Sequence, residues 1–161
     1  MTLTSDQFRH ALSRFPTGVT VVTLPPVGGT RVGVTISSLT SVSLTPPQIL
    51  FCLSKQSSVM PFVKDASFFA VNILSAAQVA LATTFIHPRC VDWDVLETRS
   101  HPGTGCVLLE GVLGHIICEK GAVYDGGDHD IILGRVIEVQ VNSSEGPLVR
   151  HAGQYLTTRP L

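Results

Sequence analysis

The sequence predicts a mainly β fold, an antiparallel β-barrel with a few short helices. Many short runs rich in Val, Ile and Thr are separated by Gly and Pro pairs, such as those at 25–29, and this spacing is typical of all-β barrels. Two segments, 8–15 and 76–84, have helical rather than strand spacing. The chain also lacks GxGxxG and GxxxxGK[ST] motifs, which argues against Rossmann and P-loop folds.

The expected elements follow from these patterns in chain order. Phe8, Leu12 and Phe15 repeat on one face of an N-terminal helix, with Ser5 or Asp6 as its N-cap. Further strands are expected at 18–24, at 31–44 as one strand or a pair, at 49–53 as a central strand, and at 67–74, 131–141 and 148–156, with a helical turn within 57–64 and a helix at 76–84.

Two regions lack a simple period. Residues 87–105 contain several prolines and glycines and predict a loop of a length usually associated with function. Residues 106–119 hold two apolar runs around Gly111 and Gly114, which indicates a hairpin or a bulged strand.

Composition bounds the class of protein. The 161 residues suit one domain, 1–161, with a proper core. Charged residues make up 14% of the chain, against roughly 25% in an average soluble domain. We therefore expect part of the surface to be covered by a ligand or in a homodimer, with 146–156 as a contributor. The net charge of −1 without a basic block argues against nucleic-acid binding.

Neither a membrane span nor a secreted protein is expected. Residues 68–85 carry no charge but include Asn, Gln, Ser and Thr, too polar for a spanning helix. The N-terminus has no long apolar signal segment. The four cysteines form no CxxC pair, so we expect free thiols in a reducing cytoplasm. Cys52 and Cys118 lie in apolar strand patterns, where a thiol acts as a small hydrophobe.

Residues 33–58 contain the most informative pattern in the chain. Hydroxyl residues alternate with apolar ones up to a Thr-Pro-Pro break at 45–47, and the next apolar run opens into Ser54-Lys55-Gln56-Ser57-Ser58. One interpretation is a half-exposed strand rich in Ser and Thr. The other is a wall that binds a planar, uncharged ligand through hydroxyls and backbone N–H groups, followed by a phosphate contact at 54–58.

The segment Asp125–Ile131, with sequence DGGDHDI, has three interpretations. An EF-hand calcium loop is excluded because the twelfth position is Val136 rather than Glu. A tight turn fits the Asp-Gly-Gly chemistry. The third interpretation depends on the family resemblance given below.

Other catalytic and metal motifs are absent. No HxH, HExxH or CxxC pattern frames the remaining histidines and cysteines, so no metal site is expected. We expect His115, in an apolar run, to be a satisfied core or interface residue, and His10, His87, His101 and His151 to be exposed or loosely packed. No GxSxG elbow supports a Ser-His-Asp hydrolase.

Five segments in order resemble one known family. These are FRHALSRFPTGVTVVT at 8–23, GVTISSLTSVSLTPPQIL at 33–50, FFAVNIL at 68–74, DGGDHDIILGRV at 125–136 and GPLVRHAGQY at 146–155. They resemble the short-chain flavin reductases, the reductase components of two-component flavin-dependent monooxygenases. The resemblance spans nearly the whole chain, and it implies a Greek-key split β-barrel of the FMN-binding type.

The resemblance also implies an activity. A member of this family transfers a hydride from NADH or NADPH to FMN or FAD and supplies the reduced flavin to a partner monooxygenase by diffusion. The residues do not decide between the two flavins or the two nicotinamides. Two alternatives remain open: a split-barrel flavoprotein that keeps its flavin and reduces another acceptor, and a non-catalytic flavin- or haem-binding barrel.

The family's site residues can be carried over by position. The resemblance implies that His129 holds the nicotinamide against the flavin, with Gly127 and Asp128 shaping the turn, and that the Thr17-Gly18 turn lies near the ring. The implied flavin contacts are Thr35, Ile36, Ser37 and Ser38 for the ring and ribityl chain, Cys52, Leu53, Ser54, Lys55 and Ser57 towards the phosphate, and Phe85 as an aromatic neighbour. Two features depart from the family pattern: Thr45 replaces a common Asp before Pro-Pro, and HPRCVDWD at 87–94 has no match.

Overall fold

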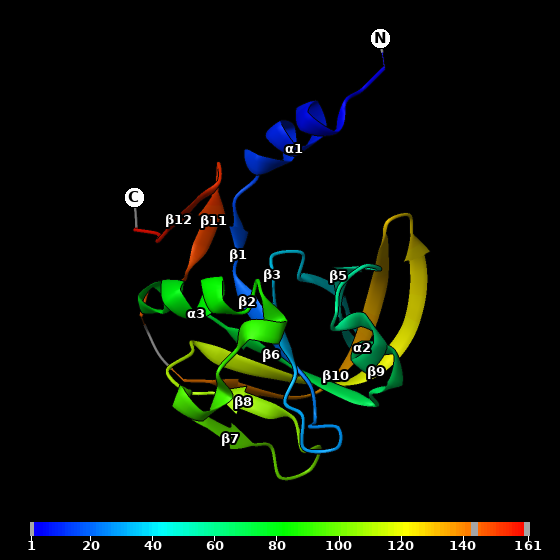
Figure 1. Ribbon diagram of the computed structural model, residues 1–161, viewed down its shortest axis with the longest axis vertical. Coiled ribbons are helices and arrows are strands. Elements are labelled where there is room, and N and C mark those ends of the chain that lie inside the picture. Colours follow the sequence, from blue (N-terminus) through cyan, green and yellow to red (C-terminus); the bar gives the residue numbers. More distant parts are fainter. Residues whose placement is uncertain (1, 143–144, 160–161) are drawn as a thin grey trace.

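In the computed structural model, a curved antiparallel sheet dominates the described residues, 2–142 and 145–159 (Figure 1). The strands of the described chain are β1 (Thr17–Gly18), β2 (Thr20–Thr23), β3 (Gly33–Ile36), β4 (Thr40–Leu44), β5 (Pro47–Ser54), β6 (Phe68–Ile73), β7 (Thr98–Ser100), β8 (Val107–Leu109), β9 (Gly114–Gly126), β10 (His129–Val141), β11 (Val149–His151) and β12 (Gln154–Leu156). Seven of them form the large sheet, in the order β3-β2-β6-β9-β10-β5-β4. The expected mainly β fold is confirmed.

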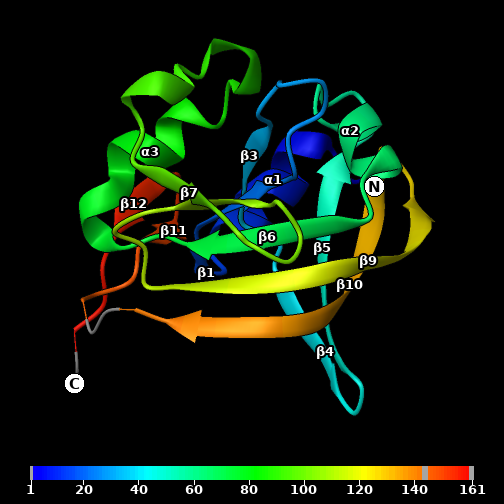
Figure 2. The ribbon, with the colours of Figure 1, turned by 90° about the horizontal axis from the view of Figure 1, so that it is seen from below.

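The two outermost strands of this sheet are consecutive in the chain. β3 ends at Ile36 and β4 begins at Thr40, so residues 37–39 alone connect opposite edges of the sheet. The sheet must therefore curl until its edges meet at this corner, and Figure 2 shows β5 running across β6, β9 and β10 while the β4–β5 turn projects beyond them. No ladder joins β3 to β4 in the described chain.

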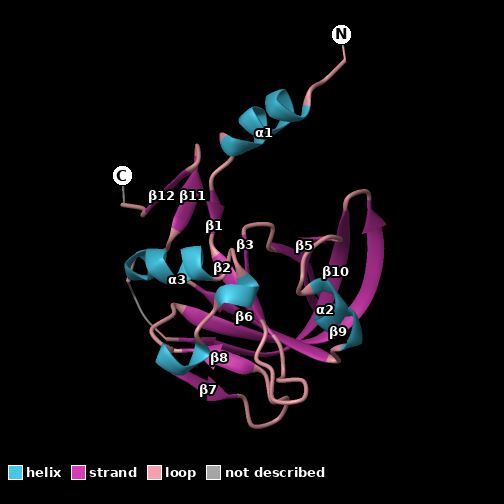
Figure 3. Cartoon of the chain, viewed as in Figure 1, coloured by secondary structure: helices cyan, strands magenta, loops and turns pink. Residues whose placement is uncertain are grey.

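Short helices surround the sheet (Figure 3). The helices are α1 (Ser5–Ser13), α2 (Met60–Asp65) and α3 (Val79–Thr84), with 3-10 turns η1 (Ala76–Gln78), η2 (Pro88–Cys90) and η3 (Trp93–Val95). β1, β11 and β12 form a small second sheet next to α1, and β7 pairs with β8 in a third. No helix in residues 2–142 and 145–159 is both long enough and apolar enough to cross a membrane.

The main core fills the inside of the curved sheet. Phe51 of β5 and Phe69 of β6 are fully buried and meet edge to face, with ring centroids 5.2 Å apart, a geometry that adds to their burial energy. Met60 and Val63 of α2 pack into the same cluster. A second cluster under α3 contains Leu74 among its members. Helix α2 thus packs on the first cluster and α3, through Ala82, on the second.

The structure corrects several expected elements. The N-cap of α1 is Thr4, neither Ser5 nor Asp6: its hydroxyl accepts from the Gln7 N–H at 3.2 Å, and the Gln7 side chain accepts from the Thr4 N–H. This reciprocal capping box satisfies two of the first-turn donors. β5 lies one place from the edge of the sheet and alternates in burial, so the apolar run 49–53 is no central strand.

The segment 106–119 is not a hairpin. β8 pairs with β7, whereas β9 pairs with β6 and β10, because the tight turn at Gly111, with φ of 70°, sends the chain to a different partner. The expected loop at 87–105 contains β7 and two 3-10 turns. The expectation of free thiols is confirmed for all four cysteines.

Candidate functional site

A hollow of about 870 Å³ opens at the corner where the sheet edges meet. Its size suits a ligand as large as a flavin. Nine of the residues carried over from the sequence line it, together with eight others. The lining residues are Val34, Thr35, Ile36, Ser37, Ser38, Cys52, Leu53, Ser54, Gln56, Ser57, Ser58, Ile86, His87, Pro88, Arg89, Cys90 and His129. Below, this hollow is called the cavity.

The first wall comes from β3 and the corner after it. The Thr35 hydroxyl donates to the Ala82 carbonyl at 2.7 Å, which ties β3 to α3. The Ser38 hydroxyl bonds both the N–H and the carbonyl of Cys52. Two of the hydroxyls expected to bind a ligand therefore hold the wall together. Because Thr35 and Ser38 already bond within the protein, a ligand would be contacted by backbone groups and by the other hydroxyls of the wall.

The second wall is the end of β5 and the turn after it. In the β5–β10 ladder Ser54 lies directly opposite His129. The Ser54 hydroxyl accepts from the Gln56 N–H at 3.3 Å, and the Ser57 hydroxyl accepts from the Val59 N–H at 3.3 Å. These short-range bonds are typical of serine-stabilised turns. They shape 54–58 into a tight, polar end of the cavity.

His129 begins β10, immediately after the turn formed by Gly127 and Asp128. Gly127 has a φ of 85°, a conformation that favours glycine. The His129 ring is half-exposed, and its Nδ1 lies 2.8 Å from the Asp128 carboxylate. This hydrogen bond holds the pKa of Asp128 below its usual range, and Arg9 of α1 adds a smaller effect. The expected tight turn is confirmed, and it places the imidazole on the cavity wall.

Two of the implied flavin contacts, Lys55 and Phe85, lie outside the cavity lining. The Lys55 ammonium contacts Asp125 and the Gly127 carbonyl, the latter at 2.6 Å, so its side chain points towards the β9–β10 turn rather than along the cavity. Phe85 is fully buried and packs edge to face on Trp93, with centroids 5.1 Å apart. A Cβ on Gly33 would lie 2.7 Å from the Phe85 ring, so the glycine allows this close packing. The neighbouring Ile86 lines the cavity instead.

The segment 86–90 forms the third wall, and the sequence reasoning left it unmatched. It contributes His87 and Arg89 among other residues. Arg89 is the one Lys or Arg among the described lining residues, and none of those residues is acidic. The cavity is therefore suited to an anionic ligand. Pro88 and Arg89 follow a predicted helix in the sequence, but no local pattern predicts that they face residues 33–58.

Two histidines outside the cavity, His101 and His115, are buried. His115 is buried, as expected; its Nε2 donates to the Leu109 carbonyl at 2.9 Å and its Nδ1 accepts from Asn142 at 3.0 Å. His101, expected to be exposed or loosely packed, is buried between Thr104 and Glu138. No group of three or more His, Cys, Asp or Glu side chains suited to a metal ion occurs in the described part of the chain.

A second hollow of about 520 Å³ adjoins the cavity. Ser37 and Ser38 line both. Its other walls include Phe15 and Thr17 near α1 and Arg150 of β11. The Thr17 segment, expected near a flavin ring, thus reaches the same corner from the opposite side.

The chain belongs to the family described as flavin reductase like domain, whose model matches residues 12–159. The FMN reductase (NADH) SmoA of Agrobacterium fabrum is 39% identical over 83% of this chain and 75% of its own length. The reductase subunit HsaB of a flavin-dependent monooxygenase from Rhodococcus jostii is 34% identical over 96% of this chain and 78% of its own. The solved NADH:FAD oxidoreductase SgcE6 of Streptomyces globisporus C-1027 superimposes with a TM-score of 0.90 at 33% identity, covering 99% of this chain and 98% of that one.

Proposed function

We propose that residues 1–161 form one flavin reductase domain that transfers a hydride from NADH or NADPH to FMN or FAD. The observation that carries the proposal is the cavity itself: in a chain of this family, a hollow of about 870 Å³ combines hydroxyl-rich walls, two histidines and a single Arg or Lys side chain. The reaction consumes one reduced nicotinamide, one oxidised flavin and one proton. The hydride leaves C4 of the nicotinamide and bonds to N5 of the flavin.

The flavin is the substrate that accepts the hydride and supplies the redox chemistry. Backbone groups and hydroxyls of Thr35–Ser38 border its ring and ribityl chain, and Cys52–Ser54 form the facing wall. Ser57 lies at the phosphate end. The walls are held by Thr35, whose hydroxyl ties β3 to α3 through Ala82, and by Ser38, whose hydroxyl ties the 37–39 corner to β5 through Cys52. Such fixed polar groups need no rearrangement when charge develops on the ring.

His129 positions the nicotinamide over the flavin ring. Its Nδ1–H donates to Asp128, which orients the imidazole and leaves Nε2 for a ligand. His129 pairs with Ser54 in the β5–β10 ladder, so its imidazole lies beside the wall formed by the end of β5. Its contribution is to the approach geometry of the two reactants.

Arg89 provides the positive charge for a ligand phosphate. It is exposed on the third wall, and the other described lining residues offer it no carboxylate. A guanidinium binds phosphate through two parallel hydrogen bonds. In this assignment Arg89 replaces Lys55, which the sequence placed at the phosphate.

The reduced flavin is released to a partner monooxygenase in a reducing cytoplasm. Support comes from the HsaB relative, which is named as a monooxygenase reductase subunit, and from four cysteines that remain free thiols. Several lining residues, such as Ser37, Gln56 and Arg89, are exposed, and a site open to solvent suits a flavin that binds and leaves in each turnover.

The working unit is a homodimer. The helix α1 buries none of its own residues and projects from the body beside the β11–β12 hairpin (Figure 1). It exposes Phe8 and Leu12, and Phe15 just after the helix is exposed as well; apolar groups that face water favour association. Sedimentation equilibrium should give twice the chain mass at micromolar concentration, and a chain that stays monomeric would contradict this assignment.

The activity is tested by the loss of reduced-nicotinamide absorbance with purified protein and excess FMN, FAD or riboflavin. Turnover that saturates with free flavin supports the reductase and names its preferred flavin and nicotinamide. Flavin that stays bound without turnover would mean that another acceptor is reduced. A protein that binds no flavin would overturn the proposal.

A further inference from the structure

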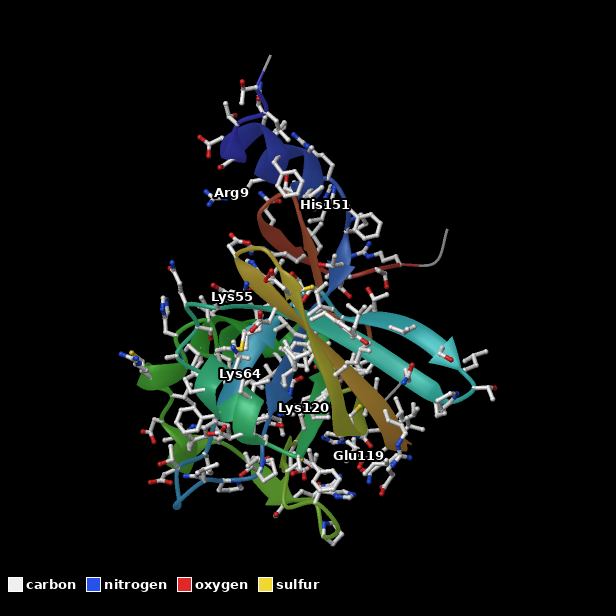
Figure 4. The ribbon with its side chains drawn as sticks, turned by 90° about the vertical axis from the view of Figure 1, so that its right-hand side faces the viewer. Arg9, Lys55, Lys64, Glu119, Lys120 and His151 are labelled. Carbon is white, nitrogen blue, oxygen red and sulfur yellow. The ribbon has the colours of Figure 1, made fainter. Side chains whose placement is uncertain are left out.

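Lys55 is bonded to the turn that carries His129 at several points. Its backbone N–H donates to the Asp128 carbonyl at 3.0 Å, and its ammonium donates to the Gly127 carbonyl at 2.6 Å. The same ammonium pairs with Asp125 at the end of β9. Figure 4 shows Lys55 beside this end of the β9–β10 hairpin. Through its backbone and its side chain, Lys55 thus binds both turn residues, Gly127 and Asp128, and the end of β9.

Asp130 extends this network into the protein. Its side chain is only 8% exposed, and its two oxygens face Lys64 at 3.1 Å and Lys55 at 3.8 Å. A carboxylate this buried needs cations or donors close by. Because Asp130 directly follows His129, Lys55 contacts the chain on both sides of the imidazole, whereas Lys64 contacts Asp130 and not the turn.

The charges in the network stabilise one another. The hydrogen bond from Lys55 lowers the pKa of Asp125, and the same bond raises the pKa of Lys55. Both groups therefore stay ionised across neutral pH. A single exposed ion pair contributes little, but here one ammonium joins two carboxylates and a carbonyl of a single hairpin end.

We propose that Lys55 is a positioning residue, which holds the turn at Gly127 and Asp128 so that His129 keeps its place on the cavity wall, and that it does not bind the flavin phosphate. The expected effect on nicotinamide kinetics rests on the proposed function, whereas the restraint of the turn by Lys55 does not. A turn without this restraint would let the imidazole shift, and displacements of about 1 Å are enough to slow a reaction that depends on approach geometry.

The kinetic test compares Lys55→Met with Lys64→Met. Both lose a cation beside Asp130, but only Lys55 touches the turn. We expect Lys55→Met to raise KM for the preferred nicotinamide by about 3- to 10-fold, with the ratio of FMN to riboflavin affinity unchanged. Lys64→Met should leave both unchanged, and Lys55→Arg should restore most of the nicotinamide response. Asp125→Asn gives a second, milder perturbation if Lys55→Met folds poorly.

Amide hydrogen exchange provides a readout that needs no turnover. Exchange at Gly127 and His129 should be faster in Lys55→Met and unchanged in Lys64→Met. Weaker binding of FMN with riboflavin unaffected would overturn the proposal in favour of a phosphate contact, as would unchanged exchange and kinetics. A wild-type protein that oxidises no reduced nicotinamide would contradict the proposed function. The amide hydrogen exchange at Gly127 and His129 would still show whether Lys55 restrains the turn.

Discussion

The Ser38 side chain acts as a strand partner for Cys52. Its hydroxyl accepts from the Cys52 N–H at 2.9 Å and donates to the Cys52 carbonyl at 3.1 Å. In the β4–β5 ladder Thr40 pairs with Leu50, so Ser38 stands two places further along the same register. There the backbone of 37–39 has turned towards β3, and the hydroxyl satisfies both groups that a strand would have paired. This bond holds the corner of the sheet at which the cavity opens.

Ser38→Ala should therefore destabilise the fold and loosen the cavity. Two half-buried backbone groups of Cys52 lose their partner, at a cost of about 1 to 2 kcal/mol. Urea unfolding gives the free energy directly. Ser37→Ala is the matched control, because the neighbouring serine lines the same cavity; an equal loss in both variants would show that the bond to Cys52 is not the cause.

His129→Ala should raise the requirement for NAD(P)H more than that for flavin. Removing the imidazole takes away a contact with the nicotinamide and leaves the walls that border the flavin, so we expect KM for the nicotinamide to rise by about tenfold. Steady-state kinetics with each substrate varied in turn measures both. The control is His10→Ala on α1, far along the chain from the cavity lining. If His129→Ala responds to both substrates as the wild type does, His129 is not part of the site.

Arg89→Gln should weaken the binding of FMN and leave riboflavin unaffected. Loss of a charge-assisted hydrogen bond to phosphate corresponds to about a tenfold rise in the dissociation constant. Quenching of flavin fluorescence on titration with protein measures both ligands. Arg99, which pairs with Glu110 and Gln140 outside the cavity, offers the matched Arg→Gln control. Equal weakening of FMN and riboflavin would exclude a phosphate contact.

Protonation of His115 should destabilise the fold at acid pH. Burial lowers the pKa of His115 below its ordinary 6.5, and the neutral ring satisfies both nitrogens through Leu109 and Asn142. The unfolded chain binds the proton near 6.5 and the folded chain only at lower pH. Stability is therefore complete above that value and falls as the pH drops below it.

The measurement is the free energy of unfolding across roughly pH 7 to 5. His115→Gln removes the buried titrating group, so its stability should fall less steeply with acid than that of the wild type. His10→Gln removes an exposed ring and should keep the wild-type slope. Parallel curves for His115→Gln and wild type would contradict the assignment.

Features set by short stretches of chain were predictable from the sequence. The Asp-Gly-Gly turn before His129 follows from residue chemistry at adjacent positions, and Gly127 takes the positive φ that the turn needs. The strand character of 31–44, the helical segment at 76–84 and the buried state of His115 follow from local hydrophobic pattern in the same way, whereas the division of 31–44 into β3 and β4 was left open. Most of the cavity wall was found because 35–38 and 52–57 are continuous segments of the family resemblance.

Only the tertiary structure decided which distant residues meet. Lys55 and Asp125 are 70 positions apart, and their contact depends on the register of β5 against β10. The same holds for Phe85, which the close approach of Gly33 takes into the core, and for Arg89, which reaches the cavity from an irregular segment. Strand propensity and turn chemistry act over a few residues, whereas strand order and register come from packing across the whole sheet. The sequence by itself thus determined the elements and the turn beneath His129, and the folded sheet decided that Lys55 serves that turn while Arg89 faces the cavity.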